Sequence, residues 1–160
     1  MKSFAARETY SFIVGVNDYH DVGLLKVKQG YFMYTVKEVL WDYWKDFVRK
    51  KKIRRKFTAY STQDWLVLAY LHALGCGPSA LGTTVPKYNG MVIIELYEGS
   101  KKPFVKVYYK DNTMEVPKDI TKSVRTCAHV PCHLIEFDLG PKSYLTKNLQ
   151  EAEQACHGLS

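Results

Sequence analysis

The chain has 160 residues, enough for one domain, and its composition is that of an ordered globular protein. Hydrophobic residues make up 46% of it and aromatic residues 14%, and a globule of this size buries roughly 70% of the surface that its unfolded chain exposes. The longest purely apolar run, Trp65 to Leu71, is far shorter than the roughly 20 residues that cross a bilayer. We therefore expect a soluble protein with no transmembrane helix, and the first residues show no signal peptide.

The formal net charge is +7, and much of it is concentrated in the run from Arg49 to Lys56, where only Ile53 is not basic. Such a run at a helix end is commonly a solvated surface that complements the helix dipole. The alternative is a surface that binds polyanions. Because no RNA-binding aromatic signature or zinc-finger spacing accompanies the run, we expect no specific nucleic-acid partner.

Residues 1–56 are predicted to be mainly helical. The opening stretch predicts a short helix followed by a loop around Gly23 and Gly30. From Tyr31 onward, apolar residues recur at alternating steps of three and four, which predicts one amphipathic helix with a core-facing stripe. The residues of that stripe are Met33, Val36, Leu40, Tyr43 and Phe47.

Residues 57–110 are predicted to form a sheet core. A strand at Phe57–Ser61 leads through a polar turn into the apolar segment Trp65–Leu74, which predicts a buried helix that ends at Gly75. After a loop rich in Gly, Pro, Ser and Thr, two β-branched segments predict an antiparallel hairpin, Met91–Tyr97 and Phe104–Tyr109.

Residues 111–160 are predicted to be a loop-rich tail with a helical turn or two before Leu139. Cys127 and Cys132 are close enough to close a small disulfide loop in an oxidising compartment. Two alternatives stay open: a zinc site that uses these cysteines with Cys156 and nearby histidines, although the spacing matches no regular zinc pattern, and free buried thiols.

Gln63 and Asp64 are the candidate site residues. A polar residue between the end of a strand and the start of a helix points into the crevice where α/β proteins bind ligands. The amino end of a helix also offers backbone N–H groups and a positive dipole, which suit a phosphate. The plain alternative is that Asp64 only caps the helix that follows it.

The segment Tyr60-Ser61-Thr62-Gln63-Asp64 resembles the Y-S-x-H-D active-site segment of histidine acid phosphatases. Further segments match that family in the expected order and extend the resemblance over nearly the whole chain. They are Leu25–Gly30, Val85-Pro86-x-Tyr88, Ile94–Tyr97, Phe104–Tyr109, and Cys127 with Cys132-x-Leu134-x2-Phe137.

The resemblance implies an α/β fold, here the C-terminal half of an incomplete three-layer α/β/α domain with one parallel-type strand at Phe57–Ser61. It implies phosphomonoester hydrolysis without a cofactor or metal, with Asp64 as the proton donor to the leaving alcohol. Gln63 stands where the family has a phosphate-binding histidine. It also implies an extracellular or lysosomal location, which agrees with the use of cysteine.

The sequence departs from the family in a way that argues against activity. The family's nucleophilic histidine belongs to an R-H-G-x-R-x-P motif, and no Arg-His dipeptide occurs in these residues. Neither His20 nor His72 is expected to replace it, since His72 lies in the apolar helix and His20 in a loop. We therefore expect no hydrolysis by this chain alone, weak phosphate or phosphomonoester binding at most, and self-association through an unpaired sheet edge at Phe57–Ser61.

Overall fold

The computed structural model describes residues 2–53, 55–100 and 102–158. The helical elements of the first half are α1 (Lys2–Val14), η1 (Asn17–Tyr19), α2 (Val22–Leu25), the π-helical turn η2 (Lys26–Gly30), α3 (Tyr31–Val48), α4 (Asp64–Ala73) and α5 (Gly77–Leu81). The second half holds η3 (Thr121–Ser123), α6 (Leu134–Leu139), η4 (Lys142–Tyr144) and α7 (Leu149–His157). The strands are β1 (Met91–Tyr97), β2 (Phe104–Lys110), β3 (Lys118–Asp119) and β4 (Cys132–His133).

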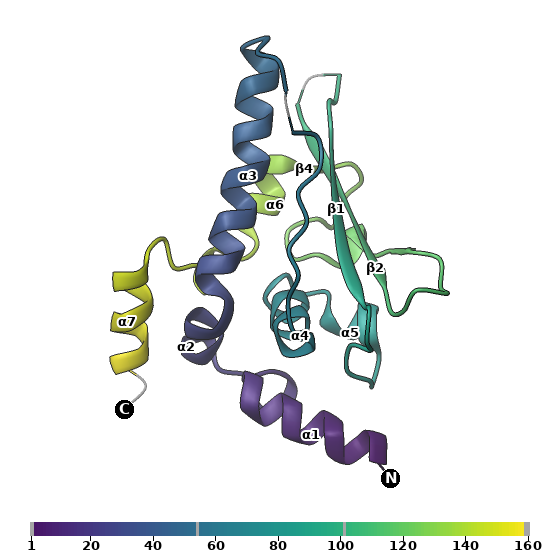
Figure 1. Ribbon diagram of the computed structural model, residues 1–160, viewed down its shortest axis with the longest axis vertical. Helices are drawn as coiled ribbons and strands as arrows, with labels where there is room; N and C mark the ends of the chain where they lie inside the picture. Colours follow the sequence, from purple (N-terminus) through teal and green to yellow (C-terminus); the bar gives the residue numbers. More distant parts are fainter. Residues whose placement is uncertain (1, 54, 101, 159–160) are drawn as a thin grey trace.

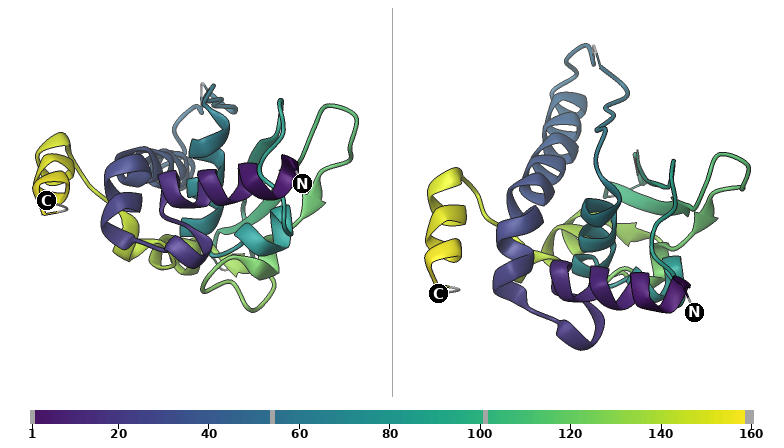
Figure 2. Two further views of the ribbon diagram at one scale, coloured as in Figure 1. Left: turned by 90° about the horizontal axis from the view of Figure 1, so that it is seen from below. Right: turned by 60° about the horizontal axis from the view of Figure 1, so that its bottom comes forward.

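Helix α4 occupies the middle of the molecule. Long helix α3 lies on one side of it and the β1–β2 hairpin on the other, while α7 lies on the far side of α2 and α3 (Figures 1 and 2). Helix α1 packs against α4. None of the helices that the structure describes is long and apolar enough to span a membrane.

The core forms where α4 meets the hairpin. Leu68, Leu71 and Leu74 of the α4 segment are almost fully buried, and so are Val105 and Val107 of β2. Alternate side chains of a strand point to opposite faces of a sheet, so these valines share the face that packs against the helices. Burial of each such side chain contributes about 1.5–3 kcal/mol, which makes α4 a rigid support for the residues at its amino end.

The sheet is antiparallel throughout its described pairings. Strand β2 pairs with β1 along its whole length, from Met91↔Lys110 to Tyr97↔Phe104. The short strands β3 and β4 pair with β2 as well, near its two ends. Strand β1 therefore has one recorded partner and forms an edge of the sheet.

Several sequence-based predictions are confirmed. The amphipathic helix from Tyr31 is α3, the apolar helix is α4, and the hairpin strands are β1 and β2. Gly75 follows α4 with φ +82°, a left-handed conformation that glycine adopts without steric cost and that ends many helices. The predicted turns before Leu139 are α6.

The predicted strand Phe57–Ser61 is wrong. The segment has no ladder partner among the described residues, and the ring of Phe57 is 80% exposed. A strand forms only when a neighbouring backbone supplies hydrogen bonds, whatever the propensity of its own residues. Two side-chain contacts hold the segment instead: Thr58 Oγ1 lies 2.6 Å from the Tyr43 hydroxyl, and the ring of Tyr60 packs edge-on against Phe32.

The structure also contains more helix than the sequence indicated. The expected loop around Gly23 and Gly30 is α2 followed by η2, and the loop after Gly75 contains α5. The polar tail contains α7, whose described residues include no buried side chain. The apolar stripe of α3 is buried at Met33 and Leu40 but is exposed at Phe47, one residue before the end of the helix.

Candidate functional site

Gln63 and Asp64 form the amino end of α4. Gln63 is the N-cap residue, with extended backbone angles, and its carbonyl oxygen accepts hydrogen bonds from the backbone N–H groups of Leu66 and Val67. Asp64 is the first helical residue, so the cap position that the plain alternative gave to Asp64 is held by Gln63. One of its carboxylate oxygens accepts a 2.7 Å hydrogen bond from the Trp65 N–H. A carboxylate here is favoured by the positive end of the helix dipole.

The second carboxylate oxygen of Asp64 is held from α1. The Tyr10 hydroxyl donates a 2.8 Å hydrogen bond to it. This hydrogen bond, burial and the negative charge of Asp64 raise the pKa of Tyr10 above its ordinary value, because loss of the tyrosine proton would place two negative charges side by side. Tyr10 therefore stays a hydrogen-bond donor and fixes the orientation of the Asp64 side chain.

Trp65 connects Gln63 to a cation. The indole N–H of Trp65 donates a hydrogen bond to the side-chain oxygen of Gln63, which leaves the amide nitrogen of Gln63 with no recorded partner in the described structure. The ammonium of Lys28, from η2, lies 5.4 Å from the centroid of the Trp65 ring, within the range of a cation–π interaction. The turn before α4 thus brings together a carboxyl group, an amide N–H donor and a positive charge.

This cluster lies at the surface. Gln63 is exposed, and Asp64, Trp65 and Lys28 are half-buried. Gln63 and Asp64 line neither the hollow between α3 and residues 51–53 and 55–58 nor the hollow beside β2 and η3. The cluster can therefore contact a small anion from solvent but does not enclose it.

His72 is remote from the cluster. It lies eight residues along α4 from Asp64, about 12 Å at the rise of an α-helix. A Cβ atom at Gly77 would come within 2.6 Å of the His72 ring, so the ring packs tightly against this glycine. Burial, and then the nearby charges of His20 and Arg7, lower the pKa of His72 to about 4. This is the behaviour of the packed histidine that the sequence predicted.

The hydrogen bond of His20 in the described structure is made to another part of the chain than Gln63 and Asp64. His20 follows η1, and its Nε2 atom lies 3.3 Å from the hydroxyl of Tyr144. Arg125 approaches the same hydroxyl and the face of the same ring. Neither His20 nor His72, the two candidate substitutes for the family nucleophile, therefore has a hydrogen bond to Asp64 in the described structure.

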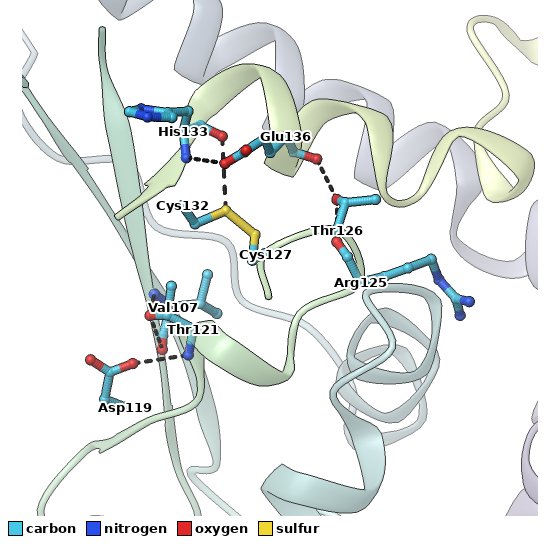
Figure 3. The surroundings of a disulfide bond; sticks show 9 residues. All are labelled: Val107, Asp119, Thr121, Arg125, Thr126, Cys127, Cys132, His133 and Glu136. Carbon is cyan, nitrogen blue, oxygen red and sulfur yellow. Dashed lines mark hydrogen bonds between the residues drawn. A yellow bond between two sulfur atoms is a disulfide. The ribbon is translucent and has the colours of Figure 1, made fainter. Parts of the chain in front are cut away.

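The predicted disulfide between Cys127 and Cys132 is present, with a Cα–Cα distance of 4.9 Å. It closes the loop that leads into α6 (Figure 3), where the His133 N–H donates to the carboxylate of Glu136 at 2.8 Å. In this pairing, two of the three thiols that the zinc alternative would use are bonded to each other. Within the described ranges, no three metal-ligating side chains converge on one point.

The basic run follows the end of α3, as predicted. Arg49 is the C-cap residue of α3, and the described basic residues from Lys50 to Lys56 are exposed on the segment that leads back toward α4. Arg54 lies outside the described residues. The run ends seven residues before Gln63, and its described residues make no hydrogen bond or ion pair with Gln63 or Asp64.

Tyr10, Lys28 and Trp65 were not identified from the sequence as site residues. Tyr10 lies in the opening stretch, for which the sequence predicts only a short helix, and Lys28 lies in the segment Leu25–Gly30. The contact of Tyr10 with Asp64 spans 54 positions, and no local spacing predicts such a contact. Two indirect signals were available: an aromatic residue directly after Asp64, and a lysine within a segment that matched the family.

Sequence comparison finds two relatives that carry the same name, "Putative acid phosphatase 1". The relative from Caenorhabditis briggsae is 40% identical over 76 residues, which are 46% of this chain and 18% of the relative. The relative from Caenorhabditis elegans is 32% identical over 74 residues, 45% of this chain and 17% of the relative. The matches thus span less than a fifth of either relative's length. No protein-family model matches the chain, and no solved structure matches it.

Proposed function

We propose that this chain is a homologue of the histidine acid phosphatases and that the turn before α4 is the part of a phosphomonoester site that protonates the leaving group. The observation that carries the proposal is the oriented carboxyl group of Asp64, whose oxygen accepts a 2.8 Å hydrogen bond from Tyr10 at the amino end of α4. The names of the two relatives and the Tyr60–Asp64 pattern support the same class of substrate.

Asp64 is the general acid in this proposal. When the bond between phosphorus and the ester oxygen breaks, the leaving alcohol needs a proton, and a positioned carboxylic acid accelerates such a step about 10²- to 10⁴-fold. The Tyr10 hydroxyl orients the carboxyl group without competing for its proton. The carboxyl group must carry this proton when the ester bond breaks.

Gln63 and Lys28 hold the phosphoryl oxygens. The side-chain oxygen of Gln63 is occupied by Trp65, and its amide N–H groups are therefore the atoms that face a ligand. An amide brings no positive charge, and loss of one electrostatic contact to a transition state typically costs about 10²- to 10³-fold in rate. The ammonium of Lys28, held against Trp65, supplies a positive charge beside the position that a histidine occupies in the family.

The chain by itself does not hydrolyse phosphomonoesters under this proposal. A covalent route requires a nucleophile that attacks phosphorus, and neither His72 nor His20 lies beside Asp64. The role proposed for the chain alone is therefore weak binding of phosphate. The attacking group would come from residues outside these 160.

The compartment and the fold class are part of the same proposal. The Cys127–Cys132 disulfide supports an extracellular or lysosomal location, because disulfides persist in oxidising compartments. Helices α3 and α4 beside the β1–β2 hairpin are compatible with part of a three-layer α/β/α domain.

Calorimetric titration of the chain with inorganic phosphate at pH 5 tests the binding role. We expect weak, saturable binding that falls about tenfold or more in Lys28→Met. The matched control is Lys26→Met, which removes the same charge from the same π-helical turn and leaves binding unchanged. Absence of binding to the unmodified chain, or equal losses in the two variants, would contradict the proposed site.

An assay with p-nitrophenyl phosphate at pH 5 tests the catalytic role. We expect the same rate as the buffer blank for the unmodified chain and for Asp64→Asn. Turnover that disappears in Asp64→Asn would show that Asp64 is the acid but that the chain carries its own nucleophile, which contradicts the proposed inactivity. Turnover that survives in Asp64→Asn would contradict the role of Asp64 as well.

A further inference from the structure

We propose that the groove between the carboxyl-terminal half of α3 and residues 51–53 and 55–58 is a second, independent binding site, which takes a nucleotide-sized organic phosphate. The groove has a volume of about 430 Å³. Pockets for small organic molecules typically measure about 300 to 1,000 Å³. Inorganic phosphate would leave most of this space empty, so the volume favours a phosphate attached to an organic body.

Two side-chain contacts fix the walls of the groove relative to each other. At one end the Tyr43 hydroxyl of α3 lies 2.6 Å from Thr58 Oγ1. Toward the end of the helix, the ammonium of Lys51 lies 3.5 Å from the carboxylate of Asp46. The segment that forms the second wall is therefore tied to α3 at two points of the lining.

The charges that line the groove leave an excess of positive charge. Its two acids already have cationic partners, since Asp46 pairs with Lys51 and Asp42 pairs with Lys45 at 3.2 Å. The groove is also lined by Lys52 and Arg55, and neither has a carboxylate within ion-pair distance in the described part of the chain. Two unpaired cations that face one hollow suit a ligand with at least two negative charges.

The apolar part of the lining provides a surface for the organic body of such a ligand. Val39, Tyr43 and Ile53 line the same hollow and are half-buried. The tyrosine ring offers a flat face against which an aromatic group can stack, an interaction worth about 0.5–1.5 kcal/mol beyond burial of the area. An apolar floor with a few charged groups is the usual composition of a small-molecule site.

A polyanionic polymer is the competing occupant of this basic surface. A polymer would contact the whole run from Arg49 to Lys56, because its binding depends on the number of charges neutralised and not on the groove. The groove itself is lined by only some of these cations, and Lys50 and Lys56 are not among them. Substitution of the cations inside the groove and of those outside it should therefore affect binding differently for the two kinds of ligand.

Titration with ADP at pH 7 in the presence of EDTA distinguishes these possibilities. We expect saturable binding of ADP that is tighter than binding of inorganic pyrophosphate. The double variant Lys52→Ala/Arg55→Ala should lose about tenfold or more in affinity for ADP. The matched control Lys50→Ala/Lys56→Ala removes two charges from the same segment outside the groove and should change affinity less than threefold. All of these residues are exposed, and thermal unfolding of each variant should match that of the unmodified chain.

Several outcomes would overturn the proposal. Equal losses in the two double variants, or binding of a heparin fragment in preference to ADP, would identify a polymer-binding surface instead of a groove. Undetectable binding of ADP would remove the site altogether. Asp64→Asn should leave ADP affinity unchanged, so failure of this proposal is separable from failure of the phosphatase proposal. Loss of ADP binding in Asp64→Asn would show that ADP binds at the amino end of α4.

Discussion

The hydroxyl of Tyr10 donates a 2.8 Å hydrogen bond to a carboxylate oxygen of Asp64 and thereby joins α1 to the first residue of α4. The two residues are 54 positions apart in the sequence. The contact orients the proposed acid and anchors the helix that packs across the centre of the molecule. The same hydrogen bond therefore contributes both to the stability of the fold and to the geometry of the site.

Tyr10→Phe should destabilise the fold by about 1–2 kcal/mol, since it removes a hydrogen bond to a charged group that is only partly buried. Because the pKa of Tyr10 is raised in the folded state, this contribution is present below the ordinary tyrosine pKa of about 10 and is lost as pH rises through the folded pKa. Urea unfolding at pH 7 measures the loss. Tyr31→Phe, at an exposed tyrosine of α3, should be neutral, and equal effects of the two changes would contradict the role of the contact.

His72 should make stability depend on pH. Its pKa of about 4 in the folded protein lies below the ordinary value of about 6.5, so the unfolded chain binds a proton that the folded chain does not between these two values. The contribution of His72 to the free energy of unfolding is therefore fully present above about pH 6.5. It declines as pH falls toward 4, with a slope of up to about 1.4 kcal/mol per pH unit.

The measurement for His72 is the free energy of unfolding from pH 7.5 to pH 4.5 in three proteins. His72→Gln should lose part of the pH dependence that the unmodified chain shows in this range. His129→Gln, at an exposed histidine of the disulfide loop, should keep all of it. Parallel curves for the unmodified chain and His72→Gln would show that the half-buried His72 does not titrate as expected.

Thiol reactivity should separate the four cysteines. Cys127 and Cys132 are joined, Cys76 is buried, and Cys156 is exposed on α7. Burial raises the pKa of the Cys76 thiol to about 12, and the thiolate is the reactive form. We therefore expect Ellman's reagent to label Cys156 alone in the native protein and Cys76 only after unfolding. Rapid labelling of Cys156→Ser in the native state would contradict the burial of Cys76.

Loss of the disulfide should destabilise the α6 end of the molecule. The bond closes a short loop, with a sequence separation of five residues, for which loop-closure entropy predicts a stabilisation of about 2 kcal/mol. Cys127→Ser/Cys132→Ser should show this loss in urea unfolding, whereas Cys156→Ser should show none. A neutral double variant would indicate that the reduced chain already holds the loop closed.

Self-association should occur through the edge of the sheet, although at β1 and not at Phe57–Ser61. Strand β1 has seven residues, contains no lysine or proline, and carries only Glu95 as a charge. Edge strands without such protection tend to pair with other chains. We expect light scattering to show species larger than a monomer, and Ile93→Lys to reduce them.

Ile93 is suited to that test because it pairs with Tyr108 on the face of the hairpin opposite the buried Val105 and Val107. The substitution therefore adds charge at the edge without entering the core. Lys122→Ala, far from β1 in sequence and exposed, serves as a surface control. A monodisperse monomer of the unmodified chain at all concentrations would contradict this prediction.

Sequence patterns correctly predicted those helices whose buried face is visible in the spacing of their own apolar residues. The stripe from Met33 to Leu40 and the apolar run from Trp65 to Leu74 each produced the expected helix, because 3.6-residue periodicity is a property of the segment itself. The prediction of a strand at Phe57–Ser61 was wrong because a strand also needs a neighbouring backbone as its hydrogen-bond partner. No segment in the described part of the chain supplies one. Helix α7 was missed because its residues are largely polar and none is buried.

Only part of the candidate site could be predicted from the sequence. The position of Gln63 and Asp64 before an apolar helix was predicted, as was the disulfide between Cys127 and Cys132. Tyr10 and Lys28 come from distant segments, and their contacts with Asp64 and Trp65 exist only in three dimensions. Sequence patterns indicate which residues begin a helix but not which side chains of other elements meet them.

A ¹H–¹⁵N spectrum titrated with inorganic phosphate at pH 5 tests the central claim most directly. If the turn before α4 holds phosphate, the side-chain amide of Gln63 and the backbone amides of Asp64 and Trp65 should shift together and saturate, and these shifts should disappear in Lys28→Met. If these resonances stay fixed while amides at the Arg49–Lys56 segment move, phosphate binds elsewhere, and the proposed role of Asp64 and Gln63 is wrong.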